Sequence, residues 1–288
     1  MKRPDLRIVQ VGENRVAYVD EGAGPVILLL HGCPFASFVW RNVIPILAAT
    51  HRCIAPDLLG LGDTETPPDA DWSLPAQESM IVDFLDALGV ERVHVVGHDH
   101  GGAVAQLLAA HHPQRIDRLV LSNAEAYDNW PSEEERPFVR LTQIPLLGAL
   151  VLWLWSRKPV LRATLAEARA VFRRDALTRE MLDAYVRANF ATRHKRNKTK
   201  RFLALQFEPS NRRVTMDVIP ALRHFDHPTL LLWARDDPHF GPQWAERLKN
   251  DLGGDVRIEL LPETGHLLME ERPEDYARAV LRFFGEAV

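Results

Sequence analysis

The sequence predicts an α/β fold in which a mostly parallel, twisted sheet is flanked by helices and carries an inserted helical lid. Short apolar runs of strand length alternate with longer amphipathic segments up to residue 124 and again from residue 223, an order typical of parallel sheets with right-handed crossovers. The stretch 125–222 contains several helical patterns and no clear strand. With 288 residues, 46% of them hydrophobic, the chain can form one such core. We therefore expect a core made of 1–124 and 223–288 and a helical lid, or cap, at 125–222.

Composition narrows the range of functions. The chain has 35 Lys and Arg against 39 Asp and Glu, a net charge of -4, so as a whole it offers no basic surface for nucleic acid. Its two cysteines, Cys33 and Cys53, make no disulfide framework, which favours a cytoplasmic protein. No apolar run follows the basic residues of 1–7, so we expect no signal peptide, and the apolar run 144–155 is too short to span a membrane. The expected partners are a small organic substrate and water, with no cofactor and no predicted oligomeric state.

The first part of the core is predicted to contain a hairpin, two buried strands and two helices. Continuous apolar runs such as Pro25–Leu30 are typical of strands that are buried on both faces. The helices show an apolar side at a helical period. In order, we expect a hairpin at 6–10 and 15–19, a strand at 25–30, a helix at 38–49, a strand at 52–56 and a helix at 75–88.

The segment 93–108 combines a strand, a tight turn and a helix. Its apolar strand runs into Gly97-His-Asp-His-Gly101, with glycines two positions before and after Asp99. The spacing is that of the G-x-S-x-G nucleophile elbow, in which glycine neighbours tolerate a strained central residue. Here the central residue is an aspartate in place of a serine. The turn therefore holds the Asp99 carboxylate at the end of the sheet, beside a helix N-terminus.

The remaining elements complete the sheet and form the lid. Ligands of open α/β sheets bind off the carboxyl ends of the strands, so a lid at that edge covers the site. We expect a strand at 116–122, lid helices at 146–155, 160–172, 179–190 and 198–206, a strand at 228–234, a helix at 242–252, a strand at 256–261 and a helix at 273–284.

Titratable residues follow four of the predicted strands. Asp99 follows one strand, Asp236 and Asp237 follow the strand 228–234, and His266 follows the last strand. Either aspartate can orient the imidazole of His266, and we favour Asp237 because the chain leaves the strand directly after it. Glu125, after a fourth strand, is the runner-up for this acid.

An aspartate in the elbow changes the chemistry. Its reference pKa of about 3.9 leaves it ionised at neutral pH, so Asp99 can displace a leaving group from an sp3 carbon and form an ester. His266 can then deprotonate the water that hydrolyses the ester. The oxyanion needs donors, and the backbone N–H groups of Cys33 and His100 are the candidates.

Five segments in this order resemble the Asp-nucleophile branch of the α/β-hydrolase superfamily, which contains haloalkane dehalogenases and epoxide hydrolases. The resemblance covers the core from about Arg15 and leaves the lid unmatched. It implies an α/β-hydrolase fold, an Asp99–His266–Asp237 triad and hydrolysis of a carbon–heteroatom bond, with haloalkane dehalogenase as the lead activity. The segments are His31–Pro34 with Trp40–Pro45, Ile54–Gly62, Gly97–Gly102, Trp233–Pro238 and Gly265–His266.

Two departures bear on the substrate. Haloalkane dehalogenases usually have a tryptophan directly after the nucleophile and a lid tryptophan or an asparagine in the HGxP turn, whereas this chain has His100 and Cys33 at the two core positions. Epoxide hydrolases use a pair of lid tyrosines, and this lid offers Tyr185, with Tyr127 at its edge. The candidates for contact with the substrate or leaving group are His31, Trp130, Trp153 and Tyr185, with His100 and Trp155 as further donors.

Other interpretations stay open. An esterase-like hydrolase, or a catalytically silent binding protein of the same fold, fits the same core. His98 and His100 flank Asp99, but no carboxylate or cysteine at ligand spacing joins them, so we expect no metal. The basic run Arg193–Arg201 is interpreted as a solvated helix end, with docking of an acidic ligand or a membrane surface as the alternative.

Overall fold

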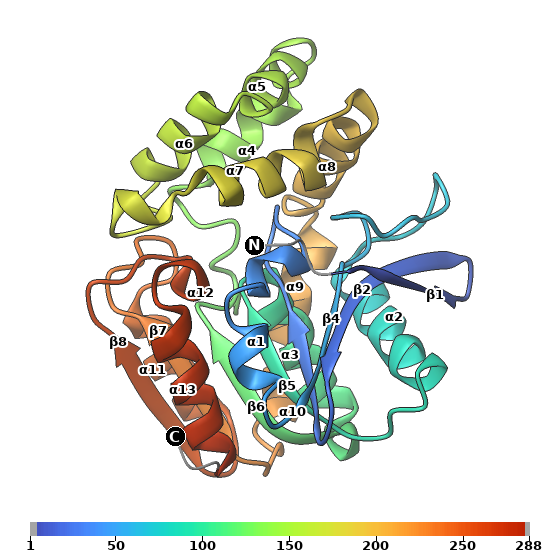
Figure 1. The fold of residues 1–288 in the computed structure, drawn as a ribbon, viewed down its shortest axis with the longest axis vertical. Coiled ribbons are helices and arrows are strands. Elements are labelled where there is room, and N and C mark those ends of the chain that lie inside the picture. The colour runs from blue at the N-terminus through green and yellow to red at the C-terminus, as the bar shows by residue number, and fades with distance from the viewer. Residues whose placement is uncertain (1–4, 286–288) are drawn as a thin grey trace.

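A computed structural model of the protein describes residues 5–285. Its centre is an eight-stranded sheet with the order β1-β2-β4-β3-β5-β6-β7-β8 (Figure 1). β1 and β2 form an antiparallel hairpin, β2 pairs antiparallel with β4, and the other neighbours are parallel. The expected α/β fold is confirmed. The strands are β1 Arg7–Val11, β2 Asn14–Gly22, β3 Val26–Leu30, β4 Arg52–Pro56, β5 Val93–His98, β6 Ile116–Ser122, β7 Thr229–Ala234 and β8 Val256–Leu261.

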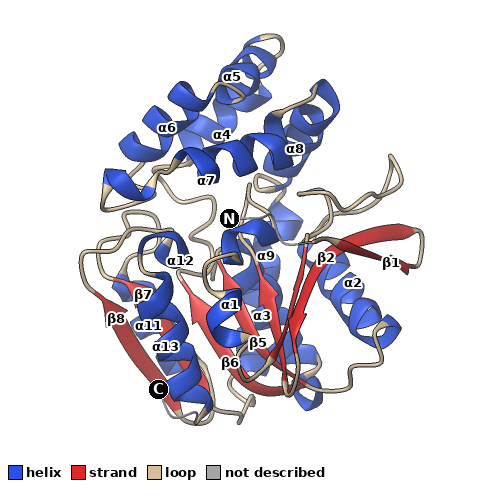
Figure 2. Cartoon of the chain, in the orientation of Figure 1, coloured by secondary structure: helices blue, strands red, loops and turns tan. Residues whose placement is uncertain are grey.

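The sheet separates two apolar layers, and β3 shows how the sequence builds both. Leu28 and Leu30 pack into one buried cluster, while Ile27 and Leu29 pack into the other, because successive side chains of a strand point to opposite faces. Helices therefore cover both faces of the sheet (Figure 2). Their bounds are α1 Ile44–Leu47, α2 Leu74–Ala87, α3 His100–His111, α11 Pro242–Asp251, α12 Leu268–Glu271 and α13 Pro273–Phe284, with short helices η1 Ser37–Trp40 and η2 Pro113–Arg115.

Five helices and two short helical segments lie together beyond the carboxyl ends of the strands (Figure 1). We call the part from α4 to α8 the cap. It consists of α4 Arg136–Gln143, α5 Leu147–Trp155, α6 Lys158–Glu167, η3 Arg174–Ala176, α7 Arg179–Tyr185, η4 Val186–Phe190 and α8 Arg193–Leu205.

The end of the expected lid lies with the core. Helices α9 (Pro209–Asp217) and α10 (Ile219–Leu222) pack against α3. Ile219 and Leu222 belong to the same buried cluster as the apolar residues of α3. The chain thus returns to the core about a dozen residues before position 222, because these apolar side chains are buried there.

Several helix boundaries differ from the sequence expectation. The helix expected at 38–49 is split into η1 and α1, because Pro45 has no N–H to continue a helix through it and sits in the first turn of α1. The helix expected from residue 198 begins at Arg193, where the Thr192 hydroxyl accepts a hydrogen bond from the backbone N–H of Lys195. Helices α4, α9, α10 and α12 had not been predicted.

Candidate active site

Asp99 occupies the sharp turn between β5 and α3. Its backbone has φ 54 and ψ -122, and its side chain is buried. A Cβ on Gly97 would lie 2.6 Å from the Gly101 carbonyl oxygen, and a Cβ on Gly101 would lie 2.3 Å from the Leu30 carbonyl oxygen. Both glycines are therefore required by close backbone approach, as the elbow pattern predicts.

The two oxygens of the Asp99 carboxylate have different partners. Oδ1 accepts a hydrogen bond of 2.7 Å from the backbone N–H of Cys33, in the turn after β3. Oδ2 lies 3.3 Å from Nε2 of His266. One of the two expected oxyanion donors is therefore already at the carboxylate. Within residues 5–285, the structure shows no hydrogen bond from the His100 backbone N–H to this carboxylate.

The strand ends bring His266 and Asp237 together. His266 Nδ1 lies 2.9 Å from Asp237 Oδ2. Asp237 is fixed in turn, because the Asn123 side-chain amide donates to Oδ2 at 2.6 Å and the His239 backbone N–H donates to Oδ1 at 2.8 Å. Asp236 is exposed. Of the two adjacent aspartates, Asp237 is thus the one that contacts the imidazole.

Charge is concentrated in this buried chain of groups. Burial alone would raise the pKa of the Asp99 carboxyl, but the hydrogen bond and charge of His266 lower this pKa to about 2. Burial alone would lower the pKa of His266, but Asp237 and Asp99 hold it well above its usual value. The pKa of Asp237 is likewise lowered by His266 against the effect of burial. The resting site is therefore an imidazolium between two carboxylates.

Glu125 contacts a different histidine. Its Oε2 lies 2.7 Å from Nδ1 of His100, and its backbone N–H donates to the Asp99 carbonyl oxygen at 3.1 Å. The His100 ring packs edge-on to Trp130 and Phe202, and its buried Nε2 has no hydrogen-bond partner within residues 5–285. Burial raises the pKa of Glu125 to about 7, while Glu125 raises the pKa of His100 against the effect of burial. The two residues form a second histidine–carboxylate pair beside the elbow.

A cavity of about 160 Å³ lies between the cap and these residues. Cys33 and His266, the two partners of the Asp99 carboxylate, both line it. The rest of its wall is largely apolar and comes from the cap and the residues next to it, from the turn after β3 and from the loop after β7. Further lining residues include Phe35, Glu135, Phe138, Val139, Trp155, Leu165, Leu203, Gln206 and His239.

The four predicted pocket residues lie outside this lining. His31 Nε2 accepts from the Leu58 backbone N–H, and its Nδ1 lies 2.8 Å from the Gly32 carbonyl oxygen, so the ring braces the turn. The Trp130 indole N–H donates to the Thr215 hydroxyl at 2.9 Å. Trp153 is 41% exposed on the outer side of α5.

The tyrosines are also engaged elsewhere. The Tyr185 hydroxyl donates to Glu270 at 2.7 Å, and Glu270 forms a buried ion pair with Arg41 at 2.6 Å. The Tyr127 hydroxyl donates to Asp251 at 2.9 Å. Neither hydroxyl is therefore available as one of the two proton donors that an epoxide hydrolase would need.

Glu135 is a site residue that the sequence interpretation missed. Its Oε2 accepts from the Ser132 backbone N–H at 3.0 Å, and its own N–H donates to the Ser132 hydroxyl at 3.3 Å. This pair of hydrogen bonds has the pattern of a capping box in the turn before α4, is visible in the sequence as Ser132-Glu-Glu-Glu135, and fixes Glu135 in the cavity wall. Burial, reinforced by the charge of Asp99, raises the pKa of Glu135.

Comparisons with known proteins agree with this architecture. Haloalkane dehalogenase 2 of Mycobacterium tuberculosis (strain ATCC 25618 / H37Rv) is 31% identical over 94% of this chain and 92% of its own length. A cis-3-alkyl-4-alkyloxetan-2-one decarboxylase of Shewanella oneidensis is 28% identical over 95% of this chain and 86% of its own. The crystal structure of a haloalkane dehalogenase from Bradyrhizobium elkani superposes with a TM-score of 0.82 at 27% identity, covering 98% and 97% of the two chains. Residues 25–273 match the family described as alpha/beta hydrolase fold, and the chain belongs to that family.

Proposed function

We propose that the protein is a hydrolase that cleaves a carbon–heteroatom bond through a covalent ester on Asp99. The observation that carries this proposal is that the two oxygens of the Asp99 carboxylate have different partners. Oδ1 is bound by the Cys33 N–H, while Oδ2 lies beside His266, and Cys33 and His266 both line the cavity. In the first step, Oδ2 attacks an sp3 carbon of the substrate, and the leaving group departs with the electron pair of the broken bond.

Hydrolysis of the ester uses His266. Formation of the ester removes the charge of Asp99, so only Asp237 still holds up the pKa of His266. The imidazole then loses its proton to solvent, and Nε2 can accept a proton from a water molecule that attacks the ester carbonyl carbon. The oxyanion develops on Oδ1, where the Cys33 N–H already donates. Its collapse releases an alcohol and restores the Asp99 carboxylate.

Small organic halides are the lead substrate class. The cavity of about 160 Å³ is lined mainly by apolar side chains, and a protein cavity of about 150 Å³ holds a molecule the size of benzene. Two relatives reported above are named as haloalkane dehalogenases. Trp155 and Gln206 carry N–H donors on the cavity wall and take the place of the usual tryptophan and asparagine as contacts for the departing halide.

Glu135 favours a second candidate, the opening of a strained oxygen-containing ring. A departing ring oxygen needs a proton, and Glu135 is a carboxyl group in the cavity wall whose pKa is raised. It therefore supplies the acid that the tyrosines do not supply. The Shewanella oneidensis relative is named for an oxetanone substrate, which is such a ring. An epoxide hydrolase activity belongs to the same class.

Product analysis tests the proposal. We expect bromobutane to yield bromide and butanol, and we expect Asp99→Asn to abolish both. Styrene oxide, a β-lactone and an activated ester complete the panel. Replacing Glu135 with Gln should leave bromide release nearly unchanged but slow ring opening by roughly 10²-fold, as for loss of a general acid. If wild-type protein transforms none of these compounds from acid to alkaline pH, the proposed function is wrong.

A further inference from the structure

The outer end of the cap exposes an unusual group of apolar side chains. Of the nine large hydrophobic residues strongly exposed in residues 5–285, six fall between positions 144 and 154. Leu146 is 89% exposed. A contiguous apolar patch of this kind on a protein surface usually marks a contact with a partner or a membrane. We call this patch the apolar tip, and it consists of Ile144, Leu146, Leu147, Leu150, Trp153 and Leu154.

The apolar tip lies on the outer side of α5, and the inner side of this helix is buried within the cap. Gly148, Leu152 and Trp155 of α5 are buried, and Trp155 reaches the cavity. α5 packs against α4, α6 and α8 and lies at the end of the molecule farthest from the sheet (Figure 1). Its apolar outer residues are therefore not needed to fold the cap.

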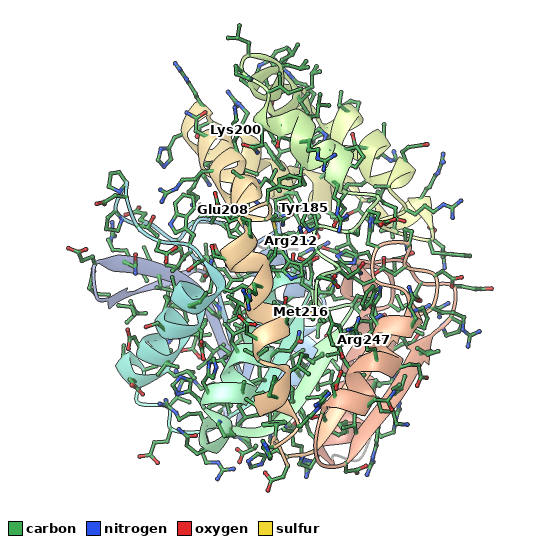
Figure 3. The ribbon with its side chains drawn as sticks, turned by 180° about the vertical axis from the view of Figure 1, so that it is seen from behind. Tyr185, Lys200, Glu208, Arg212, Met216 and Arg247 are labelled. Carbon is green, nitrogen blue, oxygen red and sulfur yellow. The ribbon has the colours of Figure 1, made fainter. Side chains whose placement is uncertain are left out.

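Positive charge is concentrated in the cap, which carries the apolar tip. Residues 136–201 contain 16 Lys and Arg against 4 Asp and Glu, a net charge of +12, although the whole chain has a net charge of -4. Arg157 stacks on Trp153, with its guanidinium carbon 4.5 Å from the ring centroid. Gln143, beside the tip, donates to the carbonyl oxygen of Lys200 on α8, and Figure 3 shows Lys200 at the cap end of the molecule. The rest of the chain has a net charge of -16.

We propose that the cap docks the protein on the surface of an anionic lipid bilayer, with the apolar tip inserted among the headgroups and the surrounding Lys and Arg side chains facing lipid phosphates. Apolar burial and attraction to acidic lipids act together in interfacial binding of this kind. Tryptophan and arginine are suited to the boundary because each combines an apolar body with a polar end.

A bilayer explains the shape of the surface better than a second copy of the chain. α5 has nine residues and is about 14 Å long, and the apolar tip consists of six side chains, far fewer than the roughly 20–30 residues that each side of a stable protein interface uses. Stable protein interfaces bury about 800 Å² on each partner. A protruding helix with an exposed apolar side can instead enter a fluid lipid surface. In residues 5–285, no single helix is long and apolar enough to cross a membrane, and α4 with α5 passes only as a pair bent by 117°.

The position of α5 connects docking to the cavity. Trp153 and Trp155 lie two positions apart on this helix, one on the outer surface and one in the cavity wall. The surface proposed to meet the lipid is thus the back of the wall that encloses an apolar substrate site. This arrangement suits a substrate that partitions into the bilayer before it enters the cavity.

Vesicle sedimentation tests the docking proposal without any measurement of catalysis. Wild-type protein should sediment with vesicles of phosphatidylcholine and phosphatidylglycerol, bind vesicles of phosphatidylcholine alone at least tenfold more weakly, and dissociate as salt is added. The double variant Leu150→Ser with Trp153→Ser should reduce binding to the anionic vesicles about tenfold or more. Arg157→Glu with Lys200→Glu should do the same.

Met216→Ser is the matched control, because Met216 is 40% exposed on α9, away from the cap (Figure 3). It should bind like the wild type, and thermal unfolding of each variant shows whether its fold is retained. Equal binding to both kinds of vesicle, no binding by wild-type protein, or full binding by a folded double variant would overturn the proposal. A dimer in light scattering that the double variant dissociates, without vesicle binding, would instead assign the surface to a second copy.

Discussion

Two histidine–carboxylate pairs adjoin Asp99, and they differ most in where the second ring nitrogen points. In each pair a carboxylate oxygen lies within 2.9 Å of Nδ1, at 2.9 Å for His266 and 2.7 Å for His100, and both rings are buried. Nε2 of His266 faces the Asp99 carboxylate, and His266 lines the cavity. Nε2 of His100 has no hydrogen-bond partner among the described residues and lies among aromatic rings. A histidine–carboxylate pair is thus not by itself a site, because the direction of the second nitrogen decides what the pair can do.

The largest expected difference between the pairs is catalytic. Asp237→Asn leaves a hydrogen-bonding group of the same size but removes the charge that supports the imidazolium, so kcat should fall by roughly 10³–10⁴. Asp236→Asn is the matched control, since Asp236 is adjacent and exposed, and its kcat should match the wild type. Steady-state kinetics on a substrate identified in the product panel measures both. Equal loss in the two variants would show that the Asp237 contact carries no special role.

The pair of Glu125 and His100 should contribute to stability and not to catalysis. Glu125→Gln weakens a buried contact to His100, so the free energy of unfolding should fall by about 1–3 kcal/mol in urea titration. The value of kcat/KM should change by less than about threefold, as expected for a residue that does not contact the reacting atoms. Glu65→Gln provides a control, because Glu65 and its partner Arg15 are both more than half exposed, and this change should cost at most about 1 kcal/mol. A large loss of kcat in folded Glu125→Gln would make the two pairs functionally equivalent.

The smallest expected effect is on titration of His266. Asp237 and Asp99 raise its folded-state pKa. The stability that the protonated imidazole contributes is therefore complete below the unfolded-state pKa of about 6.5. It is lost as the pH rises through the folded-state pKa. Asp99→Asn, an uncharged stand-in for the ester, should lower the pKa of His266 by about 1–2 pH units in an NMR titration. An unchanged pKa would contradict the proposed switch of His266 from acid to base.

The elbow and its partners could be predicted because local patterns define them. Gly97 and Gly101 mark the turn around Asp99, and Asp237 and His266 lie in the short loops after strands that end at one edge of the sheet. Parallel strands bring such ends together whatever the loops do. The sheet could be predicted for the same reason, because each of its buried strands is a local run of apolar residues.

The cavity wall could not be predicted because it depends on the rotation of cap helices. Trp153 and Trp155 are two positions apart, about 200° around a helix, and only Trp155 lines the cavity. α5 is apolar on every side, so its sequence has no period that shows which side faces inward. Glu135 is different, since the capping box with Ser132 could have been recognised from the sequence.

The most direct test of the account is the fate of Asp99 when His266 cannot activate water. His266→Ala should still form the ester but should not hydrolyse it, so intact mass after exposure to bromobutane should rise by one butyl group in place of a proton. Peptide mapping should locate the added mass on Asp99, and the double variant Asp99→Asn with His266→Ala should gain none. Unmodified His266→Ala protein, under conditions in which the wild type consumes the substrate, would contradict the covalent mechanism.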